Sequence, residues 1–442
     1  MKTTSIACGL LGLALAAPAY SQTVVDITGA TAFRSAAITA IRAKFAAGGN
    51  YQYAHDAASG GVSGANKAIF KGTFQGVTGT TVVRCSWNGS VEGVRALVDA
   101  DFNPEYYQNV AGNFVTAAAS SGGETHKDTA LFAKSVENSQ SEIAFSDVTK
   151  NSTPYAASTL SPASPQCGVV VFTMLTNEGS TITNVTSKQF RALFSNGSQP
   201  LSLFTGVAAD ESMVYAVGRN DGSGTRTAYL AETGYGITNP VNQFAITNNS
   251  SSTITTISKI KAGGVGSGVD GVNDATNAST VWAQDIDGNG GYFSGSVIRG
   301  HMGKTAANVT AYDADGTALQ EGGKADLVTW ITLADANTAR VAGAVVCGFN
   351  GVKLDNFAAG TFASGNSTFN ALTAADKAKV THGAYTAWGY QQMYARNGAY
   401  VTNTKLVYDG IKAAIPANIG TAGIPFADMA TSRPSDGGVV AP

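Results

Sequence analysis

Short runs of apolar residues alternate along the chain with segments whose apolar positions recur every three to four residues. Residues 24–27 form the first apolar run, and a Gly-containing turn at 28–31 follows it. Over residues 33–45 the apolar positions fall on one face at a 3.6-residue period, which predicts an amphipathic helix. The same order of strand, loop and helix returns at 81–86 and in the helix around Val94.

The alternation continues through most of the remaining chain. We predict further strands at 141–147, 169–173, 213–217 and 344–346, and further helices at 187–194, directly after 225 and at 297–302. Strands that alternate with helices predict an α/β fold with largely parallel sheets. Residues 231–280 are rich in Asn, Ser, Thr and Gly, which predicts loops with short strands. The Pro- and Gly-rich tail from Thr431 is expected to be frayed.

The first 21 residues have the order of a secretory signal peptide. Lys2 is followed by an apolar stretch at 6–16 and by a small-x-small cleavage site at 19–21. The apolar stretch is shorter than the about 20 residues that span a bilayer, and no later segment is long and apolar enough. We therefore expect a mature chain from Gln22 that is periplasmic or secreted and has no membrane span.

The composition and length limit which functions and which domain organisation the chain can have. Only 13% of the residues are charged and the formal net charge is −2, so no basic surface for nucleic acid is indicated. Cys85, Cys167 and Cys347 follow the predicted signal peptide, and an odd number allows at most one disulfide. Removing 21 residues from 442 leaves 421, which exceeds what one hydrophobic core supports and predicts two domains.

Small hydroxyl residues stand where predicted strands end and helices begin. Thr31, Ser90 and the run Ser223-Gly224-Thr225 all have this position. In α/β sheets ligands lie at the carboxyl ends of the strands, and the unpaired N–H groups of a helix N-terminus favour an anion. Each residue alone is more simply explained as an N-cap, but several of them together favour an anion site.

The segment Arg219-Asn220-Asp221-Gly222-Ser223-Gly224-Thr225 is the most specific motif of the chain. A strand end places a guanidinium there beside two glycines, which let backbone N–H groups approach a ligand closely. Arg219 can hold an oxyanion through two parallel hydrogen bonds. The alternative is that Asp-Gly-Ser-Gly is simply a turn.

The string Arg-x-Asp-Gly-Ser-Gly-Thr at 219–225, placed after a strand, resembles the signature of the periplasmic phosphate-binding proteins that feed ABC transporters. Other segments agree with that family in order, so the resemblance spans most of the chain. These segments are 28–33, 89–94, 144–147, 186–197, 290–303 and 383–388. Glu92 occupies a place where the family usually has glycine.

The resemblance implies a type II periplasmic-binding-protein-like α/β fold with two domains, a hinge and a ligand cleft between the domains. Domain I would comprise 22–166 and 386–442, domain II would comprise 167–385, and the hinge would lie near 167–176 and 381–388. The implied function is capture of phosphate or a similar oxyanion by a monomer, without catalysis or a cofactor, for uptake through an ABC-type permease. The ligand would be held by Thr31, Ala32, Phe33, Ser90, Asp147, Arg219, Ser223, Gly224 and Thr225.

Asp147 determines which oxyanion fits the implied site. A carboxylate repels an anion unless the ligand carries a proton to share. Asp147 would therefore suit hydrogen phosphate and reject fully ionised sulfate. The alternative is that Asp147 caps the next helix.

Other functions have weaker support in the sequence. Residues 285–290 begin like a calcium-binding loop, but its twelfth position is Ser296 rather than Glu, and the four histidines stand far apart, so no metal site is predicted. No Gly-x-Ser-x-Gly elbow with an assigned base supports a hydrolase. Three alternatives stay open: a binding protein for another oxyanion, a hydrolase of phosphate esters, and a secreted structural or adhesive protein of similarly low charge.

Overall fold

The computed structural model describes residues 22–56, 61–114, 124–127, 135–262, 272–273, 285–354, 372–420 and 423–442. The predicted signal peptide lies outside the described residues. Among the helices that the structure describes, none combines the length and the apolar character needed to cross a membrane.

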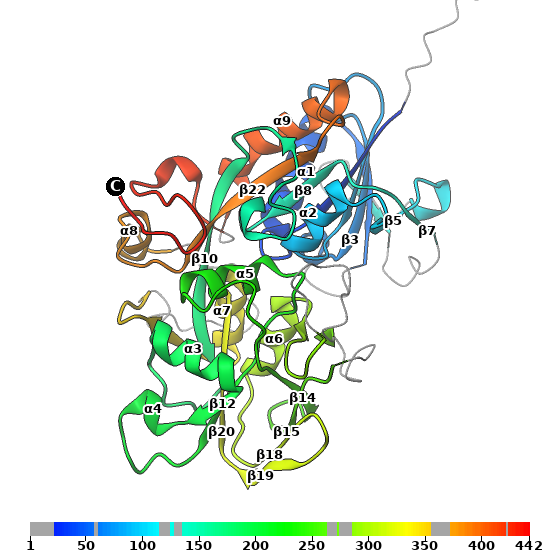
Figure 1. Ribbon diagram of the computed structural model, residues 1–442. Coiled ribbons are helices and arrows are strands. Elements are labelled where there is room, and N and C mark those ends of the chain that lie inside the picture. Colours follow the sequence, from blue (N-terminus) through cyan, green and yellow to red (C-terminus); the bar gives the residue numbers. More distant parts are fainter. Residues whose placement is uncertain are drawn as a thin grey trace, which may run out of the picture.

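One mixed sheet runs through both halves of the molecule, which lie one above the other in Figure 1. Its strand order is β12 (Ser198–Pro200), β13 (Met213–Ala216), β20 (Ala325–Thr332), β10 (Gln166–Thr176), β22 (Trp388–Arg396), β8 (Ile143–Ser146), β1 (Thr23–Gly29), β4 (Thr81–Ser86), β3 (Lys67–Gly72), β2 (Tyr51–His55) and β6 (Glu124–Lys127). Both halves share β10, because Val171 pairs with Trp388 of β22 whereas Phe172 pairs with Thr332 of β20. We call the part with β1 to β8 and β22 the first half, and the part with β12, β13 and β20 the second half.

Helices cover both faces of the strands in the first half. β1 lies between β4 and β8 and is parallel to both. Side chains alternate along β8, so Phe145 belongs to the core beneath α1 (Arg34–Gly48) and α9 (Thr402–Asn418), whereas Ala144 packs with α2 (Ser90–Val98). The carboxyl ends of these parallel strands meet at one edge, from which the chain enters α1 after β1 and α2 after β4.

The second half has an aromatic core. Phe190 and Phe194 of α3 stack with ring centroids 4.0 Å apart, and Phe190 and Tyr229 both contact the ring of Trp330 on β20. Its main helices are α3 (Ser187–Asn196), α5 (Gly224–Glu232), α6 (Gly295–Met302) and α7 (Leu333–Val341). A separate four-stranded sheet consists of β14 (Phe244–Asn249), β15 (Ile254–Lys259), β18 (Val309–Tyr312) and β19 (Ala318–Gly323).

Short elements complete the described fold. They are β5 (Glu105–Tyr107), β7 (Val136–Asn138), β9 (Leu160–Ser161), β11 (Asn184–Val185), β16 (Val272–Asn273), β17 (Gly291–Tyr292), β21 (Val345–Phe349), α4 (Ser202–Thr205) and α8 (Ala374–Thr381). β21 pairs with both β10 and β11.

The structure confirms the predicted α/β class in two halves, and every predicted strand and helix has a counterpart. The prediction of largely parallel sheets is wrong. β1 pairs in parallel with β4 and β8, but the hairpin β2–β3 and the long strands β10 and β22 pair antiparallel. Buried strands of either kind have similar apolar runs, so the hydrophobic pattern alone does not give their direction. Cys85, Cys167 and Cys347 are free and buried.

The C-terminal tail corrects a second expectation, because it is anchored rather than frayed. Arg433 is buried, forms an ion pair with Glu232 of α5 at 2.7 Å, and lies over the ring of Trp388 at 4.1 Å. Asp436 accepts hydrogen bonds from the backbone N–H of Thr149 at 2.8 Å and from its hydroxyl at 2.9 Å. The tail therefore connects α5 of the second half to the loop after β8 in the first half.

Replacing Arg433 by alanine is expected to lower the free energy of unfolding by about 3 kcal/mol, because Glu232 would stay buried without its partner. Urea denaturation measures this change. Lys377→Ala is the matched control, since its ion pair with Asp428 is exposed and should contribute at most about 1 kcal/mol. Equal denaturation midpoints for the two variants would show that the tail does not stabilise the fold.

Candidate anion-binding site

The candidate site lies where loops of the two halves meet. Thr31 lies in the loop after β1, Ser90 is the first residue of α2, which follows β4, and Asp147 directly follows β8. In the second half, Arg219 follows β13, and Thr225 lies in the first turn of α5. Because β1, β4 and β8 are parallel neighbours, their following residues gather at one edge of the sheet.

Asp147 is the centre of a buried hydrogen-bonded group that joins the two halves. Its Oδ1 accepts from the hydroxyl of Ser90, and its Oδ2 accepts from the hydroxyl of Thr225 at 3.2 Å. The backbone N–H of Asp147 donates to Ser90 Oγ at 3.1 Å. Each of these three residues is only 1% exposed. Asp147 thus binds hydroxyls at the first turns of α2 and α5 at the same time.

Arg219 reaches the first half with its guanidinium. Nη2 donates to Thr31 Oγ1 at 3.3 Å and to the carbonyl of Phe293 at 2.6 Å. Nε donates to the carbonyl of Tyr292 at 3.0 Å, and Nη1 lies 3.5 Å from Thr225 Oγ1. The two carbonyls fix the plane of the guanidinium, so its position relative to Thr225 and Thr31 is defined by the fold.

Backbone groups of the two halves also contact each other directly. The N–H groups of Val91 and Glu92, in the first turn of α2, donate to the carbonyl of Gly222 at 3.1 and 3.4 Å. A Cβ at Gly224 would lie 1.8 Å from Asp147 Oδ1 and 2.4 Å from the Ser90 hydroxyl oxygen. Only a glycine at 224 allows the two halves to approach this closely. The N–H groups at the start of α2 face the partial negative charge of the Gly222 carbonyl from the other half.

Asp147 and Arg219 each stabilise the charged form of the other across the site. Burial raises the pKa of Asp147, while the Ser90 hydroxyl, the charge of Arg219 and the Thr225 hydroxyl lower it. Burial lowers the pKa of Arg219 to about 10, and the charges of Asp147 and Asp335 oppose this. Arg219 is therefore cationic at neutral pH in a site where charges are poorly screened by water.

The structure brings together five of the residues that the sequence singles out: Thr31, Ser90, Asp147, Arg219 and Thr225. Asp147 does not cap the next helix, because the following 3-10 turn at Lys150–Ser152 has Thr149 as its N-cap. Gly224 lies in the same contact, through its backbone.

Three other predicted residues have different surroundings. The ring of Phe33 is buried in the first half, 6.2 Å from that of Phe145, and its N–H is directed to the carbonyl of Ala30 at 3.4 Å. Ala32 is half-buried and packs against apolar residues. The hydroxyl of Ser223 caps α5 by accepting from the N–H of Arg226 at 3.3 Å. The N-cap alternative therefore describes Ser223.

Sequence reasoning missed the carbonyls of Tyr292 and Phe293, which hold Arg219. Backbone acceptors have no residue signature, and only the glycines at 290–295 hinted at a close approach there. It also missed Asp335 in the first turn of α7. Oδ2 of Asp335 lies 2.5 Å from the position that a Cβ of Gly295 would take. This carboxylate comes from a distant segment that no local pattern connects with Arg219.

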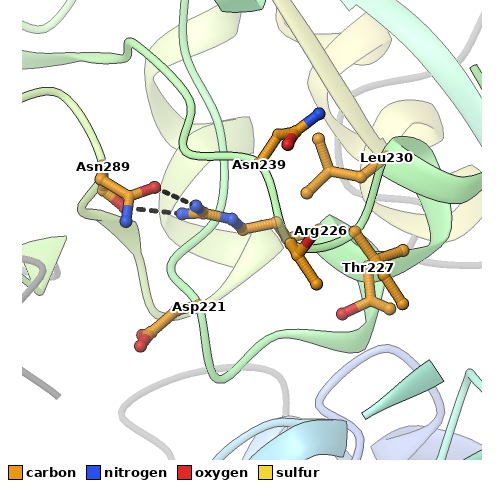
Figure 2. A pocket seen from close by; sticks show the side chains of 8 residues that line it. Asp221, Arg226, Thr227, Leu230, Asn239 and Asn289 are labelled. Atoms are coloured by element: carbon orange, nitrogen blue, oxygen red, sulfur yellow. Dashed lines mark hydrogen bonds between the residues drawn. The ribbon is translucent and has the colours of Figure 1, made fainter. Parts of the chain in front are cut away.

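A small surface pocket lies on another side of α5 (Figure 2). It is lined by Asp221, Arg226, Thr227, Leu230, Ile237, Thr238, Asn239 and Asn289. The guanidinium of Arg226 points at Asn289 and donates to both its carbonyl, at 2.6 Å, and its side-chain oxygen. Arg226 is thus occupied in fixing the loop before β17, and the pocket is separate from the group around Asp147.

Within the part of the chain that the structure describes, no three His, Cys, Asp or Glu side chains are grouped so that they could hold a metal ion.

Comparisons with known proteins concern the fold. No family model matches the chain, and no curated protein matches it either. Among solved structures, it is similar to a Clostridium perfringens protein assigned as a phosphate ABC transporter substrate-binding protein, solved with bound phosphate. That match has a TM-score of 0.43 and 12% identity, and covers 91% of this chain and 99% of the other.

Two further matches have similar descriptions. An ABC-type phosphate transport receptor from Vibrio cholerae matches with a TM-score of 0.38 and 10% identity, over 88% of this chain and 94% of that one. PstS from Borrelia burgdorferi matches with a TM-score of 0.31 and 11% identity, over 88% and 97%.

Proposed function

We propose that this protein is an exported solute-binding protein that captures a small oxyanion, phosphate, between its two halves for uptake through an ABC-type permease. A single observation carries the proposal. Arg219 and Thr225 of the second half form one buried hydrogen-bonded group with Thr31, Ser90 and Asp147 of the first half. The proposed role is capture, without catalysis.

The chemistry of this group suits hydrogen phosphate. The oxygens of an oxyanion can accept hydrogen bonds from the guanidinium of Arg219 and from the hydroxyls of Ser90 and Thr225. In the closed arrangement these hydroxyls donate to Asp147, so an entering ion would take over donors that Asp147 now holds. Asp147 would then accept the proton of the ligand, an interaction that sulfate cannot offer.

We place the hinge of the proposed capture in β10. Its partner changes from β22 to β20 between Val171 and Phe172, inside the predicted hinge segment 167–176. The second crossing of the chain ends at Trp388, where β22 begins, and lies in the predicted segment 381–388. Domain I would thus comprise 22–166 and 386–442, and domain II 167–385, as the resemblance implies. Rotation about these two crossings would separate the halves and admit a ligand.

Small-angle X-ray scattering tests capture by closure. The direct contacts between the halves must break before an ion can enter, so we expect an open population in solution that phosphate converts to the closed one. The radius of gyration should therefore fall when phosphate is added. Sodium chloride at matched ionic strength is the control. If phosphate binds and the radius of gyration stays unchanged, capture by closure is wrong.

A further inference from the structure

Arg34 is a buried arginine beside the candidate site that the proposed function does not use. It is the first residue of α1, three positions after Thr31, whose hydroxyl accepts from Arg219. Its Nη1 donates to the side-chain oxygen of Asn66, and the carbonyl of Asn66 accepts from the N–H of Trp87 in the loop that leads to α2. Arg34 therefore lies at the edge of the sheet where the loops of the first half gather.

Few partners satisfy this guanidinium. Arg34 is 8% exposed, and its one hydrogen bond to another described residue, Asn66, uses one of five N–H donors. Within the described residues, no carboxylate lies within ion-pair distance of it. Arg84 pairs with Asp26, and Arg433 pairs with Glu232. Arg219 and Arg226 are buried without an ion pair among the described residues, but they donate four and three hydrogen bonds. A buried cation without an ion pair is costly unless a counter-charge reaches it.

The charged groups around Arg34 come from both halves. Burial lowers its pKa, Asp335 and Asp56 raise it, and Arg299 lowers it. Asp56 is engaged elsewhere, since its Oδ1 accepts from the N–H groups of Asn66 and Lys67 at 2.8 and 3.0 Å.

Asp335 is also engaged, through an ion pair with Arg299 at 2.8 Å. The position of a Cβ at Gly295 lies 2.5 Å from Asp335 Oδ2 and 4.0 Å from Arg219 Nη1, so Asp335 lies near Arg219 as well. Three arginines, Arg34, Arg219 and Arg299, thus face three carboxylates, Asp56, Asp147 and Asp335, and among the described residues only Arg299 forms an ion pair with one of them. Arg34 therefore keeps a charge and donors that an anion could engage.

We propose that Arg34 is a second ligand-binding arginine of the anion site and makes it selective for the doubly charged form of hydrogen phosphate. This inference rests on the proposed function. Asp147 requires a proton on the ligand, which excludes sulfate, and Arg34 favours a second negative charge, which disfavours dihydrogen phosphate. Among sulfate, dihydrogen phosphate and hydrogen phosphate, only the hydrogen phosphate dianion meets both requirements.

Calorimetric titration with inorganic phosphate at about pH 5.5 and about pH 8 tests the role of Arg34, because inorganic phosphate passes from its singly to its doubly charged form between these two pH values. Wild type should bind more tightly at the higher pH. Arg34→Gln should weaken binding at about pH 8 by at least about tenfold and remove most of the difference between the two pH values. Arg34→Lys keeps the charge and should retain that difference, with affinity reduced several-fold.

Arg191→Gln is the matched control, since it removes one positive charge from the half-buried Arg191 on α3 and should leave both affinities unchanged. If wild type binds no phosphate, the proposed function itself fails. If wild type binds and Arg34→Gln binds equally well, or loses the same factor at both pH values, the inference fails while the proposed function stands. Should Arg34→Gln not fold, Arg34→Lys decides: loss of the pH difference in a folded lysine variant contradicts a charge role.

Discussion

Replacing Arg219 by alanine is expected to weaken phosphate binding by at least about 2 kcal/mol, or about thirtyfold, at neutral pH. Arg219 is cationic there, is 2% exposed, and is the only residue of the proposed site whose donors reach both Thr31 and Thr225. The variant would lose the charge and the planar pair of donors together. Calorimetric titration with phosphate at fixed salt measures the change.

Two variants separate this role from general effects of charge. Arg219→Lys should fall between wild type and alanine, because an ammonium keeps the charge but not the planar pair of donors. Arg191→Ala removes an arginine on α3 and should bind like wild type. Thermal melting of each variant checks that it is folded. A folded Arg219→Ala that binds phosphate as wild type does would remove Arg219 from the site.

Replacing Asp147 by asparagine is expected to erode discrimination between phosphate and sulfate by at least about tenfold. The carboxylate accepts from Ser90 and Thr225, and in the proposed complex it would accept the proton of the ligand. An amide of the same shape can donate to a fully ionised oxygen, so sulfate would gain affinity while phosphate loses its proton acceptor. Paired titrations with the two anions give the ratio of affinities.

Asp409→Asn is the control for Asp147→Asn, because its carboxylate is 44% exposed on α9 and pairs with Lys405 of the same helix. It should leave the ratio of the two affinities unchanged. If Asp147→Asn also keeps the wild-type ratio, Asp147 does not select the ligand, and another oxyanion becomes the better candidate.

Local patterns in the sequence were sufficient for the elements that carry the candidate site. The strand and helix predicted at 213–217 and after 225 are β13 and α5, and the helix predicted at 187–194 is α3. Thr186 caps α3 and forms a capping box with Gln189. Strand, cap and helix periodicity depend on neighbouring residues, so the chain encodes them locally.

Long-range features were not predictable in the same way. The direction of strand pairing depends on which distant segments meet, and the long antiparallel strand β22 pairs with β8 and β10 from a position more than 200 residues later. The C-terminal tail likewise depends on contacts with distant segments. Its Pro- and Gly-rich composition indicated fraying, whereas Arg433 and Asp436 find partners only in the folded chain.

The residues of the proposed site were found partly from local sequence patterns and partly from long-range contacts in the structure. The motif at 219–225 identified Arg219 and Thr225, but the resemblance alone linked them to Asp147, and the structure adds the hydrogen bonds. No sequence pattern indicated a role in the site for Arg34 or Asp335, because each lies in a helix, where charged residues are common. Their importance depends on burial and on neighbours from the other half.

Calorimetric titration of the purified wild-type protein with phosphate, beside sulfate and molybdate at the same pH and ionic strength, tests the proposed function most directly. We expect saturable binding of one phosphate per chain, with sulfate weaker by at least about tenfold because it has no proton for Asp147. Tight binding of molybdate or sulfate instead would identify a different oxyanion. Binding of none of the three would contradict an anion-capturing role and favour a secreted structural or adhesive protein.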